Sequence, residues 1–108
     1  MSPPILACNI QAIGAVQRPR YHDLVSRLRA AIRDRRELPD GYEYSLDSAK
    51  IKLPEVSEWI AMEQLCCPFL IFQVEGAGEA SHMTMRGPDG VKPLLQEEFP
   101  IREEFPNG

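Results

Sequence analysis

The stretch Cys66-Cys67-Pro68-Phe69-Leu70-Ile71 joins a predicted helix to a predicted strand and places two adjacent thiols at the junction. Pro68 disfavours helical backbone at the residue before it, so the helix is expected to end at Cys66 or Cys67. The apolar run that follows is typical of a strand. This junction therefore indicates both where a helix stops and where the central hairpin begins.

The residues before the junction predict a helix that carries one carboxylate on its apolar side. Pro54 suits the first turn of a helix, and apolar residues recur after it at helical spacing. Glu63 lies on the same stripe, three and four residues before the two cysteines, so its side chain is expected to project toward them. The stripe consists of Val56, Trp59, Ile60, Glu63 and Cys66 with Cys67.

The strand after the junction is predicted to pair with a second strand across a glycine-containing turn. Pairing Val74 with Met83 and Phe72 with Met85 gathers the apolar side chains on one face. A slip of one residue would mix apolar and charged side chains, so the pattern favours this register. The same register places His82 at the far end of the hairpin, away from the thiols.

The remaining elements follow from hydrophobic periodicity. Alternating apolar residues predict strands, and repeats at three- and four-residue spacing predict helices. The pattern predicts strands over residues 5–10, with Cys8 on the inner face, and 42–47, and helices over residues 21–36, 54–67 and 91–99, the last with Asp89 as its cap.

These elements predict an α+β fold in the order β-α-β-α-β-β-α. We expect a four-stranded, largely antiparallel sheet with the helices packed on one face. The 108 residues suffice for a single domain, expected over residues 1–99, while residues 100–108 lack periodicity and predict a tail. Phe69 and Ile71 leave the other face of the sheet partly apolar, which suggests a homodimer.

Composition argues against several classes of function. Hydrophobic residues make up 44% and charged residues 26% of the chain, as in a globular domain. A net charge of −4 argues against general nucleic-acid binding, and no stretch approaches the roughly 20 apolar residues of a membrane span. No signal peptide is recognised, and three cysteines with two adjacent do not resemble a secreted disulfide framework. A cytoplasmic location is therefore expected.

The cysteines suggest a site for a soft ion. A disulfide between the adjacent Cys66 and Cys67 would be strained, because their Cα atoms lie about 3.8 Å apart and an unstrained bridge needs about 4.4 to 6.8 Å. Two neighbouring thiolates suit Zn(II), Cu(I), Hg(II) or trivalent arsenic. With Cys8 as a third sulfur and Glu63 as an oxygen ligand, the set reaches the ligand count of a zinc site.

Two other functions fit the same residues. In the first, the cysteines only pack as small hydrophobes in a structural or protein-interaction domain. In the second, the protein is a thiol-dependent enzyme with Cys67 as nucleophile, Glu63 as base and Arg86 as stabilising cation. The negative end of a helix dipole raises the pKa of a thiol, which argues against that catalytic role. The sequence leaves all three functions open.

Several of these residues also resemble the signature of a family. Glu63-x-x-Cys66-Cys67-Pro68-Phe69 resembles the E-x-x-C-C-P-F sequence of a family of small uncharacterised bacterial proteins. An early cysteine, a Gly-Tyr strand start and a Gly-Pro-acidic-Gly turn strengthen the resemblance, and correspond here to Cys8, Gly41-Tyr42 and residues 87–90. The resemblance spans most of the chain up to about Phe99. It implies no reaction, since that family has no established activity, but it groups Cys8, Glu63, Cys66 and Cys67 as a set.

Overall fold

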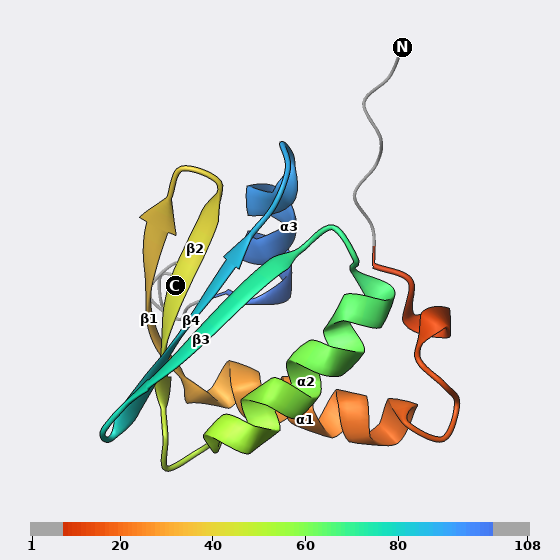
Figure 1. The fold of residues 1–108 in the computed structure, drawn as a ribbon, viewed down its shortest axis with the longest axis horizontal. Helices are drawn as coiled ribbons and strands as arrows, with labels where there is room; N and C mark the ends of the chain where they lie inside the picture. The colour runs from red at the N-terminus through yellow and green to blue at the C-terminus, as the bar shows by residue number, and fades with distance from the viewer. Residues whose placement is uncertain (1–7, 101–108) are drawn as a thin grey trace, which may run out of the picture.

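A four-stranded antiparallel sheet, covered on one face by helices, forms the structure of residues 8–100, which a computed structural model describes (Figure 1). The elements are the 3-10 helix η1 (Ile10–Ala12), α1 (Arg18–Ala31), β1 (Ile32–Leu38), β2 (Gly41–Asp47), α2 (Leu53–Cys66), β3 (Ile71–Ala77), β4 (Ala80–Arg86) and α3 (Val91–Glu98). The strand order in the sheet is β1-β2-β4-β3. The predicted α+β fold class is confirmed. Within residues 8–100, every helix is too short or too polar to cross a bilayer.

The core lies between the sheet and the helices. Alternate residues of β2 and β4 enter it, and Tyr44 and Met83 are fully buried there. Trp59 of α2 packs edge-on against Phe72 of β3 and against Phe99, with ring centroids 5.6 and 5.5 Å apart. These contacts fix α2 on the sheet, and α2 carries the cysteine pair at its end.

The β3–β4 hairpin has the predicted register. Val74 pairs with Met83 and Phe72 with Met85, so the apolar side chains share the face that the helices cover. The sequence pattern predicts strands over residues 69–75 and 81–86 with a turn over residues 76–80. The turn is shorter, because β3 continues to Ala77 and β4 begins at Ala80. Gly78 in this turn has a φ of 67°, a conformation that favours glycine.

The edge strand β1 comes from a segment that was expected to be helical. The predicted helix over residues 21–36 ends at Ala31, and the chain continues directly into β1. Between Ile32 and Leu38 the segment contains no apolar residue, so a helix there would have no face to bury. As an edge strand it pairs its backbone with β2, Leu38 opposite Gly41, while its charged side chains remain near solvent.

The strand predicted over residues 5–10 is wrong in its described part. Cys8 and Asn9 are irregular, and η1 follows. The Asn9 side chain accepts a hydrogen bond from the Gln11 backbone N–H at 3.1 Å, a local contact that competes with strand pairing. Residues 5–7, and the predicted tail beyond Pro100, lie outside the described residues.

The predicted cap of the last helix is also wrong. Gly90, with a φ of 95°, occupies the N-cap position of α3, and no side chain caps this end. Asp89 lies one residue too early for that role. The remaining predicted elements agree with the structure to within a few residues at their ends.

Gly41 is expected to tolerate no side chain. A Cβ there would overlap the Met85 carbonyl oxygen and lie 2.8 Å from the Arg86 Cα. Because these are backbone atoms of a paired strand, Gly41→Ala should lower the free energy of unfolding by about 1–3 kcal/mol, as overpacking does. Urea denaturation followed by circular dichroism measures the change. Gly14→Ala is the control, since its Cβ would make an ordinary contact, 3.8 Å from Gln17 Oε1. Equal stability of the two variants would contradict the β2–β4 pairing.

Candidate functional site

Three sulfur atoms and one carboxyl group meet where α2 ends. The ligand atoms of Cys8, Glu63, Cys66 and Cys67 all lie within 4.8 Å of one another. Glu63 is 4% exposed, Cys66 and Cys67 are buried, and Cys8 is half-buried. The structure therefore brings together the four residues that were predicted from the sequence as a set.

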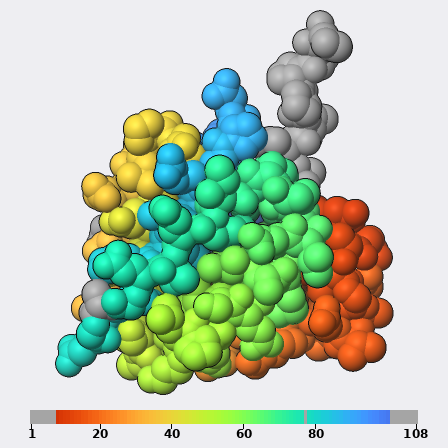
Figure 2. All heavy atoms as spheres, in the orientation of Figure 1, coloured from red at the N-terminus to blue at the C-terminus, as the bar shows by residue number. Residues whose placement is uncertain are grey.

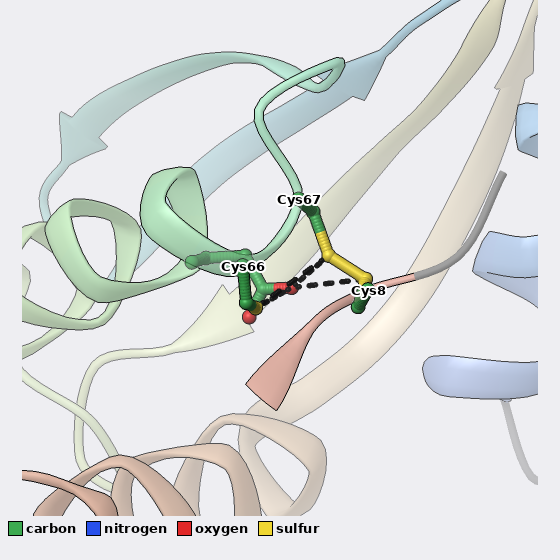
Figure 3. A group of neighbouring side chains, drawn as sticks. Cys8, Cys66 and Cys67 are labelled. Atoms are coloured by element: carbon green, nitrogen blue, oxygen red, sulfur yellow. Dashed lines mark hydrogen bonds between the residues drawn. A yellow bond between two sulfur atoms is a disulfide. The ribbon is translucent and has the colours of Figure 1, made fainter. Parts of the chain in front are cut away.

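The end of α2 positions the two adjacent cysteines. Cys66 is the last helical residue, and Cys67 has left the helical region with φ −128° and ψ 68°, as expected before a proline. The Cys67 amide still donates to the Glu63 carbonyl oxygen at 2.7 Å. As a result the two sulfur atoms lie 3.6 Å apart (Figure 3). Both lie on the side of the helix that carries Glu63, since each contacts its carboxyl group.

Cys8 reaches the group from the segment before η1. The Asn9 amide donates to the Cys66 carbonyl oxygen at 2.8 Å, which satisfies one of the carbonyl groups left free at a helix C-terminus. Figure 2 shows the N-terminal part of the described chain (red) in contact with α2 (green). The contact holds Cys8 beside the cysteine pair.

Cys8 and Cys67 form a disulfide, with their Cα atoms 4.7 Å apart (Figure 3). This separation lies within the usual range for a bridge. Cys66 keeps its thiol. The sequence did not predict this bridge. Without the fold, a Cα–Cα distance was known only for the adjacent residues Cys66 and Cys67, and not for Cys8 and Cys67.

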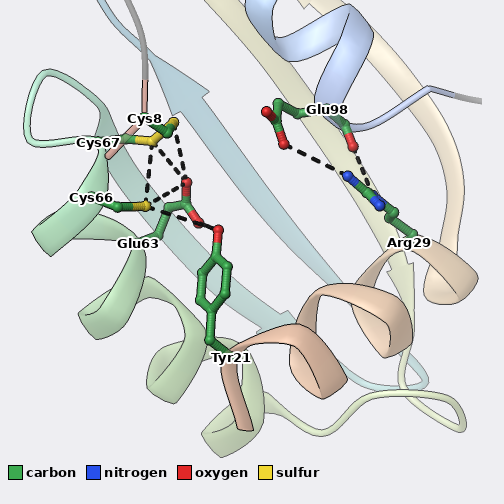
Figure 4. A network of polar contacts seen from close by, with 7 residues as sticks. All are labelled: Cys8, Tyr21, Arg29, Glu63, Cys66, Cys67 and Glu98. Atoms are coloured by element: carbon green, nitrogen blue, oxygen red, sulfur yellow. Dashed lines mark hydrogen bonds and ion pairs between the residues drawn. A yellow bond between two sulfur atoms is a disulfide. The ribbon is translucent and has the colours of Figure 1, made fainter. Parts of the chain in front are cut away.

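Tyr21 of α1 holds the buried carboxyl group of Glu63. Its hydroxyl donates to Glu63 Oε2 at 2.6 Å and lies 3.9 Å from Cys66 Sγ (Figure 4). The other oxygen, Glu63 Oε1, lies 2.9 Å from Cys67 Sγ, 3.6 Å from Cys66 Sγ and 3.7 Å from Cys8 Sγ. Tyrosine thus fixes one oxygen of the carboxyl group, and the other faces the three sulfur atoms.

Tyr21 is not among the site residues predicted from the sequence. A usable signal exists, since Tyr21, Leu24 and Leu28 form the inner stripe of α1 and are all buried. A buried tyrosine hydroxyl usually has a hydrogen-bond partner. The nature of that partner, however, depends on how α1 packs against α2.

Burial favours the uncharged forms of Glu63, Cys66 and Tyr21. It raises the pKa of the Glu63 carboxyl above its ordinary value, although the hydrogen bond from Tyr21 acts in the opposite direction. Burial, followed by the Glu63 charge, raises the pKa of the Cys66 thiol to about 11. The pKa of Tyr21 is raised in the same way. A cation that binds this site must therefore displace protons.

Arg86 does not join the group. Its Nε donates to both carboxylate oxygens of Asp40, at 3.0 and 3.1 Å. The cation expected to stabilise a catalytic Cys67 is therefore bound elsewhere. His82 pairs with Glu75 in the hairpin, at the end remote from the thiols, as predicted.

A partly open pocket of about 330 Å³ adjoins the site. Cys8, Tyr21 and Cys66 line it on one side, and Arg29 and Glu98 line it on the other. Figure 4 shows these two groups facing one another, with Arg29 paired to Glu98 at 3.6 Å. Of the three cysteines, Cys8 and Cys66 line this pocket and Cys67 does not.

Comparison of the chain with protein-family models, with curated proteins and with solved structures found no match.

Glu63→Gln should change how stability depends on pH. Because the pKa of Glu63 is raised in the folded protein, the folded state holds this proton more tightly than the unfolded chain does. Wild-type stability should therefore fall as pH rises above 4.5, the ordinary pKa, toward the raised pKa. The glutamine variant lacks this loss, so it should gain stability relative to wild type over that range. Denaturant titrations at several pH values measure the difference.

Glu58→Gln is the matched control. The hydrogen bond and ion pair with Arg20 lower the pKa of Glu58. The ionised Glu58 side chain therefore stabilises the folded state at pH values above 4.5, its ordinary pKa, and this stabilisation is lost as the pH falls. This variant should therefore lose stability relative to wild type as pH rises through its lowered pKa. A difference between Glu63→Gln and wild type that stays constant with pH would contradict the effect of burial at Glu63.

Proposed function

We propose that the reduced form of this site binds a soft metal or metalloid ion through Cys8, Cys66, Cys67 and Glu63. The observation that carries the proposal is the convergence of their ligand atoms within 4.8 Å. Thiolates are the preferred protein ligands of soft ions such as Cu(I) and of Zn(II). Three sulfurs and one carboxylate oxygen also supply the four ligands of a tetrahedral zinc site.

The separations within the group support this assignment. Two sulfurs that each lie about 2.3 Å from a tetrahedral zinc ion are about 3.8 Å apart, and a sulfur and an oxygen ligand are about 3.5 Å apart. Cys66 Sγ lies 3.6 Å from both Cys67 Sγ and Glu63 Oε1, and Cys8 Sγ lies 3.7 Å from Glu63 Oε1. These three separations are already close to those of an occupied site.

Two separations that involve Cys67 are shorter than those between the ligands of a tetrahedral zinc ion. One is its bond to Cys8, and the other is its 2.9 Å contact with Glu63 Oε1. Reduction of the disulfide removes the first constraint and lets the Cys67 side chain move away from both neighbours. A trivalent arsenic ion would use the three sulfurs alone, each thiol replacing a hydroxyl group with release of water.

Glu63 distinguishes this site from a cluster of cysteines that only packs. Burying a carboxyl group costs free energy unless its contacts compensate, and an apolar residue on this stripe of α2 would avoid that cost. Coordination of an ion by the Glu63 carboxylate would compensate the free-energy cost of burying this group among three sulfur atoms. A thiol-dependent enzyme is less well supported, because Cys67 is fully buried and bonded to Cys8, and Arg86 binds Asp40.

Titration of the reduced protein with Zn(II), Hg(II) and arsenite tests the proposal. In a phosphine reductant, we expect tight binding of a single equivalent of Zn(II) or Hg(II) with release of protons, and binding of both ions that strengthens as pH rises. Arsenite should also bind as a single equivalent, but with release of water and no net release of protons. The variant Cys66→Ser with Cys67→Ser should lose this binding. Glu63→Gln should weaken zinc binding more than arsenite binding, since only zinc needs the oxygen ligand. Calorimetry in buffers of different ionisation enthalpy measures both affinity and proton release.

His82→Ala is the control for this titration. It removes a metal-binding side chain outside the group and should leave affinity unchanged. Unchanged affinity in the double serine variant would rule out the proposed ligands. Binding that is lost equally in His82→Ala would place the ion elsewhere.

A further inference from the structure

The two cysteines of the disulfide differ in their exposure to solvent. Cys8 is half-buried and lines the 330 Å³ pocket. Cys67 is 0% exposed and is not among the lining residues. A molecule in the pocket therefore meets Cys8 and not Cys67.

The pocket suits a small molecule with charges of both signs. Its volume is near the lower limit for small-molecule sites, which excludes a folded protein from its interior. Val25 and Ile10 supply apolar surface, while Arg29 and Glu98 place a cation and an anion 3.6 Å apart at the other side. A low-molecular-weight thiol that carries both a carboxylate and an ammonium group matches these features.

We infer that this pocket admits a small zwitterionic thiol that opens the disulfide by attack on Cys8. The sulfur of the thiol forms a bond with Cys8 Sγ, the bond between Cys8 and Cys67 breaks, and the proton of the thiol passes to Cys67. The new Cys67 thiol then donates to Glu63 Oε1, which already lies 2.9 Å away. A second thiol molecule then attacks the sulfur of the small molecule that is bound to Cys8. The two small molecules leave together, joined by a disulfide bond. Cys8 takes up the second proton, so two thiols are oxidised and the protein gains two hydrogens.

The consequence of this exchange is a switch of the ligand set. In the oxidised protein, two of the three sulfurs are bonded to each other and cannot serve as thiolate ligands. In the reduced protein, all three are available beside Glu63. This regulatory role rests on the proposed function, whereas the exchange step itself needs no ion and is tested without one.

Reduction with reduced glutathione in the absence of metal tests the inference. During the reaction, samples of the oxidised protein are quenched with excess N-ethylmaleimide, which blocks the free thiols, and are then digested with trypsin. Trypsin separates Cys8 from Cys67 because cleavage sites such as Lys52 lie between them. Mass spectrometry should find the glutathione adduct on the Cys8 peptide. An adduct on the Cys66–Cys67 peptide, or no reduction of the folded protein by glutathione, would overturn the inference.

A pair of tryptophan variants tests the role of the pocket. His22 is exposed and lines the pocket from α1, so His22→Trp should narrow it and slow reduction by glutathione several-fold. Val16→Trp adds an indole at a position that is 93% exposed and outside the pocket, and should leave the rate unchanged. Equal rates for the two folded variants would overturn the pocket as the route. If His22→Trp does not fold, the position of the adduct still decides.

The two proposals fail in different ways. An adduct on Cys8 without any binding of zinc or arsenite after full reduction would refute the proposed function and leave the exchange step intact. Tight ion binding by protein reduced with a phosphine, together with resistance to glutathione, would refute the exchange step alone.

Discussion

The steric conflict between a proline ring and the preceding residue governs this structure. It takes Cys67 out of helical backbone while the Cys67 amide remains bonded to the Glu63 carbonyl oxygen. In a continuous helix, successive side chains point about 100° apart; here the sulfurs of Cys66 and Cys67 lie 3.6 Å apart. The same break lets the chain enter β3 at Ile71, only a few residues later. One proline thus creates the thiol pair and places the central hairpin.

The site also joins parts of the fold that are distant in sequence. Cys8 and Cys67 are separated by 59 positions, and a bridge across such a loop stabilises a protein by about 4 kcal/mol in the chain-entropy description. Tyr21 ties α1 to the same point through Glu63. Reduction therefore removes a cross-link at the moment that it frees two thiols of the proposed ion site, and an ion bound by Cys8 and Cys67 would restore the connection. The proposed ion binding and the stability of the fold are coupled, because the same two sulfur atoms form the cross-link and would bind the ion.

The elements that could be predicted from the sequence are those with local signals. Pro54 and Pro68 mark the two ends of α2, face matching sets the hairpin register, and Glu63 is recognisable as a carboxyl group on an apolar stripe. Strand β1 could not be predicted, because its arginines and glutamate are favourable in helices and only pairing with β2 makes it a strand. The disulfide and the role of Tyr21 depend on packing between segments, which periodicity within one segment does not reveal.

X-ray absorption spectroscopy at the zinc edge tests the central claim most directly. The reduced protein loaded with Zn(II) should show three sulfur ligands at about 2.3 Å and one oxygen ligand at about 2.0–2.2 Å. That result would place the ion among Cys8, Cys66, Cys67 and Glu63. A spectrum accounted for by nitrogen and oxygen ligands, with no sulfur, would contradict the account.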